Sequence, residues 1–522
     1  MGDGIERVTG KAPVAESRIE VDSALWNKLF YSLLALVTAW RLIYAAIAPL
    51  ELAADEAYYW DWSRALDWCY YSKPPMVAWL IALSTRALGA TELTVRLPAV
   101  VLGSVGMWAL FLLARRLFGS RTAVWTVAAA AASPGSATLG LVMTTDAPLV
   151  CFWCLAQYGL WRAIENHEDN LFWWTLTAVF TGLGILSKPM MLAFPALAIL
   201  FLFFAPRERK TLGMGRPAVF SLCSLWGLIP LLWWNARHGW VTLHHSRQHF
   251  EAAHGSILKF MGLPFEFIGS QLLVVSPLTF LLLAIAFVCC MRSRNEQDSR
   301  LRYLLVFSAL PLAIFLVMSC RQRIIPNWPA VYYPAAMAVL AAWALGDAPC
   351  GNRMPNRRKL FKWGVVFGVA LTLLAYALPF VAERLGPEGN KLVFLRKLRG
   401  WDELGGEVGA VLAGLPNKDK TFLIADGRQV VSELAFYTPG QPRVYDWNGK
   451  PGVVRSQYDI WPGPSDKTGW DALVVVRSGA AVSESLKAAF HSMDLYKEIR
   501  VRSELVGDRR YDVYWAHEMQ LR

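Results

Sequence analysis

Two carboxylate sites at the ends of apolar segments could carry out acid–base chemistry. Asp55 and Glu56 directly follow the first apolar segment, and Asp146 stands at the start of another, in the stretch TTDAP. A carboxylate close to a hydroxyl group can act as its general base, with a pKa that partial burial raises. The structural alternatives are a solvated helix start for Asp55 and Glu56 and an N-cap for Asp146. With cations nearby, an active site is favoured, in which Asp55 and Asp146 are catalytic and Glu56 contacts the substrate.

Four cations near the same apolar segments could bind an anion. Lys73 in YSKPP and Lys188 in LSKPM each follow a small residue and precede a proline. Proline fits the first turn of a helix, so each lysine is expected near a helix N-terminus, a place that favours anions. Arg321 follows a later apolar segment, and Arg41 lies inside the first one, where a charge is costly and functional by default. A ligand that carries a phosphate could be bound by all four cations. The alternative is that the two lysines only reach toward the lipid headgroups.

Seven aromatic residues lie between Asp55 and Lys73: Tyr58, Tyr59, Trp60, Trp62, Trp68, Tyr70 and Tyr71. Such a group is typical of the aromatic belt at a membrane–water interface. The alternative is stacking on a sugar or contact with a lipid chain, for which Tyr58 and Tyr59 are the candidates closest to Asp55.

Histidines gather between His238 and His254, a stretch that holds five of the eight in the chain. His245 and His249 are four residues apart and would share a helical face, as zinc ligands do. They are weak metal candidates, so a divalent metal is an open alternative and not an expected cofactor.

The composition is that of an integral membrane protein. Of the 522 residues, 55% are hydrophobic, and the mean hydropathy is +0.33. Apolar runs long enough to cross about 30 Å of hydrocarbon recur through the first three-quarters of the chain. The net charge of +12 comes from basic residues between these runs, as in cytoplasmic loops. This pattern argues against a nucleic-acid partner.

We predict about 11 transmembrane helices, in a mainly α protein. Their expected ranges are 29–50, 97–118, 122–142, 146–163, 171–187, 189–205, 217–234, 265–291, 302–319, 328–346 and 361–381. A twelfth apolar segment, 76–88, is short for a span and carries Arg86.

Loop charge decides the orientation. If 76–88 does not cross and the N-terminus is cytoplasmic, the inner loops hold 16 Lys and Arg in 52 residues and the outer loops 10 in 89. The positive-inside rule favours this arrangement, which places Asp55, Lys73, Asp146 and Lys188 together on the outer side.

Three regions follow from these patterns. Residues 1–28 are expected to be a cytosolic tail, 29–382 a transmembrane domain with a first outer loop at 51–96, and 383–522 a small periplasmic α/β domain. In the last region we expect strands at 421–425, 472–476 and 509–515, and helices at 429–437 and 482–493.

Several short motifs together resemble one known family. They are the acidic pair after the first membrane helix, Lys73-Pro74-Pro75 with Trp79-Leu80, Arg96-Leu97-Pro98, TDAPL (145–149), LSKP (186–189), WWNARHGW (233–240) and PNWPAVYYP (326–334). The combination is similar to the polyprenyl-phosphate-sugar-dependent glycosyltransferases of the GT-C fold. The nearest groups are the aminoarabinose transferases and the bacterial protein-mannosyltransferase-like enzymes. The resemblance covers 29–346 well and the C-terminal region only loosely.

This resemblance implies a sugar carried on an undecaprenyl-type phosphate. It is transferred outside the bacterial inner membrane, with inversion, to an acceptor such as lipid A or another outer glycan. Asp55 then matches the catalytic carboxylate, and Asp146 a second acidic position that orients a substrate. Lys73, Lys188 and Arg321 would hold the lipid phosphate, whose leaving charge they stabilise.

One position departs from the family pattern. Aminoarabinose transferases often carry glutamate before the KPP lysine, where it is linked to metal binding, whereas this chain has Ser72. The departure argues against a metal site and against the aminoarabinose assignment in particular. The competing class is a transporter or lipid flippase, which would more often show a repeated half and charges near mid-membrane.

Overall fold

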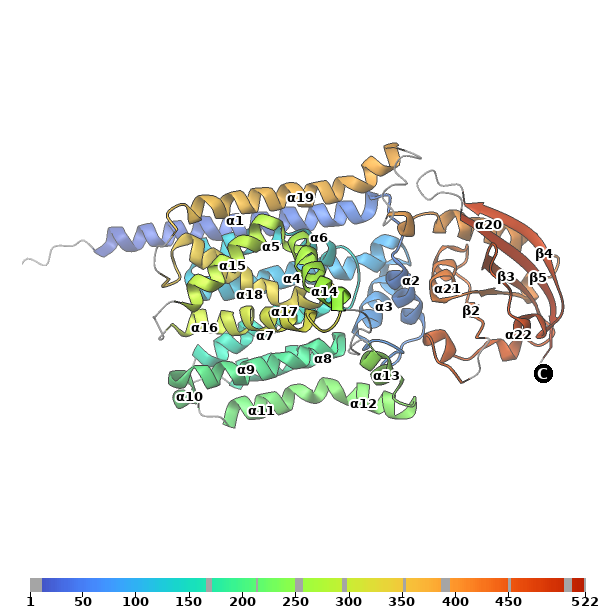
Figure 1. Cartoon of the computed structure of the whole chain (residues 1–522), viewed down its shortest axis with the longest axis horizontal. Coiled ribbons are helices and arrows are strands. Elements are labelled where there is room, and N and C mark those ends of the chain that lie inside the picture. Colours follow the sequence, from blue (N-terminus) through green and yellow to red (C-terminus); the bar gives the residue numbers. More distant parts are fainter. Residues whose placement is uncertain are drawn as a thin grey trace, which may run out of the picture.

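The computed structural model describes residues 12–165, 171–212, 215–248, 257–292, 298–350, 354–385, 395–448, 452–501 and 509–520. Long helices run side by side in one bundle, and a five-stranded sheet lies beyond one end of it (Figure 1). Two short helices, α2 (Ala54–Arg64) and α3 (Met76–Leu88), lie between the bundle and the sheet.

The bundle is built from helices of very different lengths. In chain order they are α1 (Ala12–Ile47), α4 (Glu92–Phe118), α5 (Ser120–Ala131), α6 (Pro134–Leu139), α7 (Asp146–Glu165), α8 (Leu171–Ser187), α9 (Ala193–Phe204), α10 (Pro206–Leu212), α11 (Gly215–Ser224), α12 (Leu228–Arg237), α13 (Val241–Gln248), α14 (Ile257–Val275), α15 (Pro277–Met291), α16 (Ser299–Val306), α17 (Ala309–Ser319), α18 (Tyr333–Leu345) and α19 (Arg357–Leu385). Among the described residues, six helices are long and apolar enough to cross a membrane, or seven if a bent pair counts as one span. The chain is a multi-pass membrane protein, and the predicted count of 11 spans is not confirmed.

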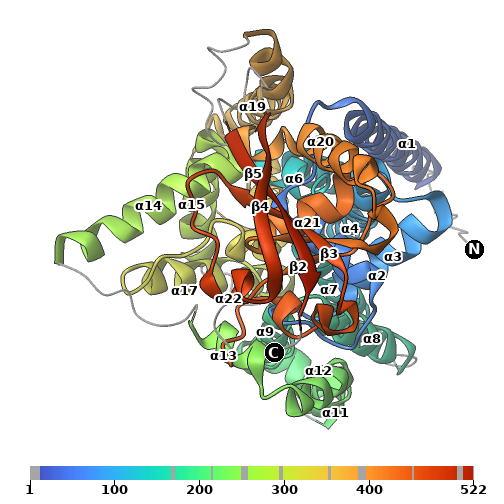
Figure 2. The ribbon, with the colours of Figure 1, turned by 90° about the vertical axis from the view of Figure 1, so that its right-hand side faces the viewer.

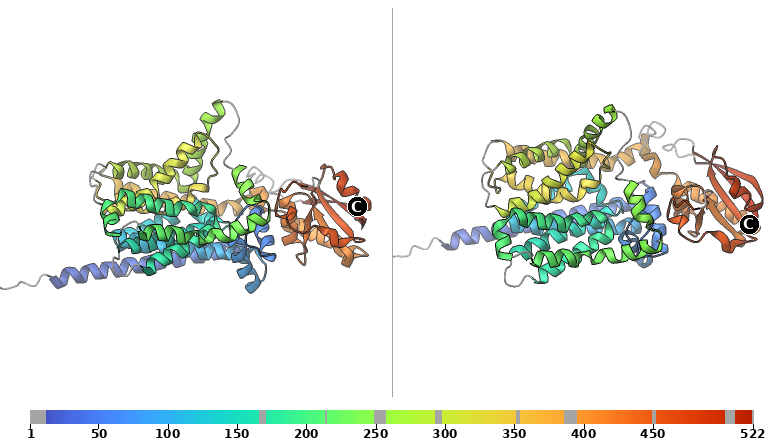
Figure 3. Two further views of the ribbon diagram at one scale, coloured as in Figure 1. Left: turned by 90° about the horizontal axis from the view of Figure 1, so that it is seen from below. Right: turned by 60° about the horizontal axis from the view of Figure 1, so that its bottom comes forward.

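The predicted span 265–291 is wrong as a single helix. It consists of α14 and α15, whose axes meet at 107°. Ser276 breaks the helix with a φ of +76°, and its hydroxyl accepts from the backbone N–H of Thr279 at the start of α15. Pro277 follows, and it lacks the N–H that would continue the helical ladder. As a result α14 projects away from the bundle (Figures 2 and 3).

The short apolar segment 76–88 forms α3, a helix of 13 residues. This length is below the roughly 20 residues that a membrane span needs. Figure 1 places α3 beside α2 at the end of the bundle that faces the sheet, in line with a segment that does not cross.

The C-terminal region is a mixed α/β unit. Its strands are β1 (Thr421–Ala425), β2 (Val444–Asp446), β3 (Asp471–Arg477), β4 (Phe490–Val501) and β5 (Arg509–Met519), in the order β2-β1-β3-β5-β4. β1 pairs in parallel with β2 and β3, whereas β5 pairs antiparallel with β3 and β4. Its helices are α20 (Trp401–Gly414), α21 (Arg428–Tyr437) and α22 (Glu484–Lys487).

One predicted helix of this region is wrong. Only Glu484–Lys487 of the segment 482–493 is helical, and the chain then enters the long strand β4. β4 is held by its antiparallel pairing along β5, so a long-range partner overrides the local helical pattern.

The aromatic residues after Asp55 are not a membrane belt. Tyr58, Trp60, Trp62 and Tyr70 are at most 2% exposed and belong to a hydrophobic core that also contains residues of α21 and the sheet. Trp68, by contrast, is 49% exposed. Most of this segment therefore joins the bundle to the C-terminal unit through a shared core.

Candidate active site

Asp146 is held in a buried network at the start of α7. Lys188 places its Nζ 2.7 Å from Oδ1, and the side-chain amide of Asn327 donates to Oδ2 at 2.7 Å. Lys188 follows directly after α8 in an extended conformation, as expected for a residue before a proline. Asp146 opens α7, which packs against α8. The carboxylate is only 5% exposed and both its oxygens have partners, so it is fixed rather than free.

Asp55 lies in the first turn of α2, in a more open setting. Its Oδ1 is 3.2 Å from Nη1 of Arg428, and the two side chains are 50% and 44% exposed. Arg428 is the first residue of α21, after Gly427 with a φ of +83°. The Arg428 guanidinium also lies 4.9 Å from the ring centre of Tyr58. The C-terminal unit thus brings a cation to the predicted catalytic carboxylate.

Lys73 lies in the field of both carboxylates. Burial lowers the pKa of Lys73, and the neighbouring charges of Lys188 and Arg428 lower it further, while Asp146 and Asp55 oppose the change. We call Asp55, Lys73, Asp146, Lys188 and Arg428 the charge cluster. Lys73 is the one member for which no ion pair is formed with another described residue, so an anionic ligand suits this position.

Glu56 ties together the segments that carry the two aspartates. Its carboxylate accepts from the backbone N–H of Ala53 at 3.0 Å and of Met143 at 2.9 Å, and the Arg96 guanidinium contacts it at 3.4 Å. Glu56 is fully buried. These contacts give it a positioning role between α2, α4 and the segment before Asp146, whereas the sequence suggested direct substrate binding.

The C-terminal unit is docked on α2 by buried polar contacts. The hydroxyl of Tyr58 accepts from the backbone N–H of Gln457 at 2.6 Å, and the Gln457 side chain accepts from the N–H of Tyr71 at 2.7 Å. Asp61 accepts from the Tyr458 hydroxyl at 2.8 Å. Burial raises the pKa of Asp61, opposed by nearby arginines. This docking fixes Arg428 relative to Asp55.

The neighbouring Tyr59 is also buried, at 4% exposure. Burial raises its pKa well above the ordinary value, and the charges of Asp55 and Asp146 raise it further. Its phenol therefore stays protonated in the field of the two aspartates of the charge cluster. It remains a candidate for contact with the substrate.

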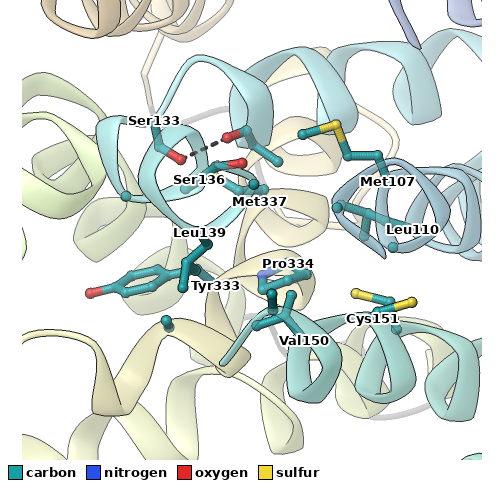
Figure 4. Close-up of a pocket in the computed structure, with 18 of the residues that line it drawn as sticks. Met107, Leu110, Ser133, Ser136, Leu139, Val150, Cys151, Tyr333, Pro334 and Met337 are labelled. Atoms are coloured by element: carbon teal, nitrogen blue, oxygen red, sulfur yellow. Dashed lines mark hydrogen bonds between the residues drawn. The ribbon is translucent and has the colours of Figure 1, made fainter. Parts of the chain in front are cut away.

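Two other predicted cations lie elsewhere. Arg41 in α1 is 2% exposed and donates from Nη2 to the carbonyl of Ser136 at 2.8 Å. It lines a cavity of about 90 Å³ inside the bundle, together with the residues labelled in Figure 4, such as Met107 and Cys151. Arg321 is exposed in the loop after α17. The contact from that loop to Asp146 comes instead from Asn327.

The described residues offer no donor set for a metal. His245 packs against Tyr71 with ring centres 4.7 Å apart and the ring planes tilted by 47°, and His249 lies outside the described residues. Within the part of the chain that is described, no three His, Cys, Asp or Glu side chains come together as metal ligands would. Ser72 before Lys73 adds no carboxylate ligand either, so the described residues do not fit a metal site.

Solved structures decide the fold. The chain superposes on ArnT from Cupriavidus metallidurans bound to undecaprenyl phosphate with a TM-score of 0.61, at 17% identity, over 94% of this chain and 98% of that one. The chain has the GT-C fold. An archaeal oligosaccharyltransferase from Archaeoglobus fulgidus matches less closely, with a TM-score of 0.51 at 12% identity, over 85% of this chain and 67% of that one.

Sequence relatives of this GT-C chain are glycosyltransferases. Residues 72–234 match a family described as dolichyl-phosphate-mannose-protein mannosyltransferase. The lipid A galacturonosyltransferase RgtD of Rhizobium johnstonii is 27% identical over 83% of this chain and 87% of its own length. An undecaprenyl phosphate-alpha-4-amino-4-deoxy-L-arabinose arabinosyl transferase of Pseudomonas aeruginosa is 29% identical over 35% of each chain. The resemblance drawn from the motifs is confirmed.

Two site residues were missed in the sequence. Asn327 lies in the stretch PNWPAVYYP, which was noted as a family-like segment without a role for its asparagine. Arg428 begins a predicted helix in the C-terminal region, and no local pattern connects it to Asp55.

Proposed function

We propose that the chain is a membrane glycosyltransferase that moves a sugar from a polyprenyl phosphate to an acceptor of the cell envelope, such as lipid A or another outer glycan. The observation that carries the proposal is the charge cluster, in which two carboxylates and three cations meet at one end of a GT-C bundle. Transfer from a lipid phosphate needs a base for the acceptor hydroxyl and cations for the departing phosphate.

Asp55 acts as the base in this reaction. The acceptor oxygen attacks C1 of the sugar and forms the new glycosidic bond, while the bond from C1 to the phosphate oxygen breaks and its electron pair leaves with the phosphate. The acceptor proton passes to Asp55. Arg428 approaches Oδ1 of Asp55, which leaves Oδ2 for the hydroxyl. One displacement at C1 inverts its configuration.

Lys73 binds the lipid phosphate. Its buried ammonium has a lowered pKa because burial disfavours the charged form, and an arriving phosphate dianion reverses that effect. Lys188 lies close enough to share the phosphate charge, although it is already paired with Asp146. Asp146 holds Lys188 and Asn327 in place and orients the bound substrate.

We further propose that the membrane is the bacterial inner membrane, with the N-terminus cytoplasmic and the C-terminal unit periplasmic. The distribution of basic residues among the loops supports this orientation. The proposed regions are a tail at 1–28, whose residues from Ala12 onward form the first part of the helix α1, the catalytic membrane domain at 29–382 and the periplasmic unit at 383–522.

Transfer with purified protein separates this proposal from a transporter or flippase. The full chain in lipid vesicles is supplied with a radiolabelled polyprenyl-phosphate sugar and purified lipid A. We expect a labelled glycoside from the wild type and from the surface control Asp466→Asn. Asp55→Asn should bind the labelled lipid and form the glycoside about 10²–10⁴ times more slowly. Movement of the lipid across the vesicle without any glycoside would contradict the proposal.

A further inference from the structure

A second pocket lies in the C-terminal unit, on the side of the sheet away from α21. It measures about 340 Å³ and is lined by Ile424, Ala425 and Asp426 at the end of β1, Val474 and Val476 of β3, and by Trp447, Arg455, Val482, Ser483 and Leu486. Ligand pockets typically measure about 300–1,000 Å³, so one or two sugar-sized units would fit. Figure 2 shows the exposed face of this sheet, with α22 beside it and α21 behind.

The topology of the sheet creates this pocket. β1 and β3 are adjacent and parallel. The connection after β1 leads to α21, which packs on the face that carries Leu423 and Val475. The connection after β3 leads to Leu486 of α22, on the opposite face. Ligands in open α/β sheets usually bind at the carboxyl ends of two neighbouring parallel strands. The connections after these two strands leave toward opposite faces of the sheet.

The chemistry of the pocket suits a sugar without negative charge. Trp447 is half-buried in its wall, and its indole N–H donates to the Ser485 hydroxyl at 3.2 Å, which holds the ring in place. Arg455 lies 3.6 Å from both Asp446 and Asp459. Two carboxylates behind the pocket wall thus already hold this guanidinium, and the exposed Asp426 adds a carboxylate to the lining itself. The surplus of negative charge disfavours a phosphate or a uronic acid, whereas hydroxyl and amino groups match it.

The pocket adjoins the charge cluster through the chain itself. Asp426 lines the pocket and Arg428, two residues later, contacts Asp55. Two residues span at most about 7 Å. Gly427 between them donates its N–H to Asp446, the carboxylate that Arg455 contacts. A saccharide seated in the pocket can therefore extend its next unit toward Arg428.

We propose that this pocket is an acceptor subsite that binds a neutral or amino sugar unit of the envelope glycan. The proposal rests on the proposed function, because it assigns the pocket to the acceptor of the same transfer. It places acceptor recognition in the C-terminal unit and bond formation at Asp55.

Binding to the full chain in lipid nanodiscs tests the subsite. Saturation-transfer NMR is recorded with a glucosamine disaccharide, a glucose disaccharide and a galacturonic acid disaccharide. We expect signals from the first two and little from the third. Trp447→Ala and the exposed Asp426→Asn should each lose most of the signal, while Tyr496→Ala, an exposed aromatic residue of the same unit that does not line the pocket, should keep it. Retention of full signal by both pocket variants would overturn the proposal.

Transfer kinetics link the pocket to the acceptor. With purified lipopolysaccharide as acceptor, Trp447→Ala should raise its KM about tenfold, with the KM of the donor unchanged, as for the loss of one anchoring aromatic. An unchanged acceptor KM in a variant that no longer binds the disaccharides means that the pocket serves a free glycan, which contradicts an acceptor subsite. The wild-type protein could also bind the disaccharides through Trp447 and yet form no glycoside. That result would contradict the proposed function and leave the sugar-binding site in place.

Discussion

Asp146 and Asp55 belong to one charge cluster, yet the fold holds them in opposite ways. Asp146 is 5% exposed, is bound by Lys188 and Asn327, and has all its partners within the membrane bundle. Asp55 is 50% exposed, and its partner Arg428 comes from the C-terminal unit. A carboxylate with both oxygens occupied is suited to holding other groups in place. One that is half exposed can meet a hydroxyl group, and the contrast therefore supports our proposal that Asp55 is the base.

Breaking the buried pair should have the largest effect on stability. Asp146→Asn leaves the Lys188 ammonium buried without its counter-ion, and Lys188→Met does the converse. Each change should cost about 3–5 kcal/mol. The double variant should recover part of that loss, since no lone charge remains. Unfolding of the purified protein in detergent measures this. Single variants within 1 kcal/mol of the wild type would show that Asp146 is no more rigidly held than Asp55.

Glu51 tests whether the C-terminal unit stays docked beside Asp55. Its carboxylate accepts from the backbone N–H groups of Gly400 and Trp401, at 2.9 and 2.6 Å. Burial raises its pKa from 4.5 to about 7, so the folded protein binds this proton more tightly than the unfolded chain. The stability that Glu51 contributes is therefore fully present below pH 4.5 and lost as the pH rises through about 7.

Glu51→Gln should remove this pH dependence. The amide oxygen can accept from only one of the two N–H groups, a loss that does not depend on pH, and the amide does not titrate. The wild type should therefore lose roughly 3 kcal/mol relative to the variant between pH 4.5 and 8. Unfolding at both pH values, with the exposed Glu407→Gln as control, provides the measurement. Parallel pH profiles for wild type and Glu51→Gln would show that Glu51 does not link the two parts.

Lys73 tests the part of the charge cluster that we assign to the phosphate of the donor. Lys73→Met removes the unpaired cation of the charge cluster and should raise the donor KM about 10–100-fold, because hydrogen bonds to charged groups contribute about 1.5–3 kcal/mol. The surface variant Lys497→Met should leave it unchanged. A donor KM like that of the wild type in Lys73→Met would show that the phosphate does not bind at this lysine.

The Asp55–Arg428 pair should have the smallest effect on stability. An ion pair between exposed side chains contributes at most about 1 kcal/mol and weakens as salt is added. Arg428→Gln should therefore lower the free energy of unfolding by less than this amount, with Arg428→Lys close to the wild type. Thermal unfolding of the wild type and both variants at low and high salt measures these differences in stability. A loss as large as that of Asp146→Asn would remove the distinction between the two aspartates.

The sequence was informative about the part of the site that the bundle builds. Asp146 and Lys188 each stand in a motif with proline at a helix boundary, and loop charge predicted both on the same side of the membrane, although their ion pair was not predicted. Glu56 was predicted from its place beside Asp55 to contact the substrate, and the positioning contacts that it makes were not foreseen. Its contacts with Met143 and Arg96 depend on how three segments pack, which spacing does not reveal.

The contribution of the C-terminal unit could not be predicted from local patterns. Arg428 meets Asp55 because α21 packs on α2 through a shared aromatic core, and those aromatics were interpreted as a membrane belt. Likewise, β4 looked helical because its strand character comes from pairing with β5. Both errors concern contacts between segments that are distant along the chain.

The most direct test of the account is a single-turnover measurement on Asp55→Asn loaded with the polyprenyl-phosphate sugar. With saturating acceptor, the rate of glycoside formation should fall by about 10²–10⁴, the usual contribution of a general base. Its affinity for the donor should equal that of the wild type. A first-turnover rate like that of the wild type would contradict the assignment of Asp55 as the base.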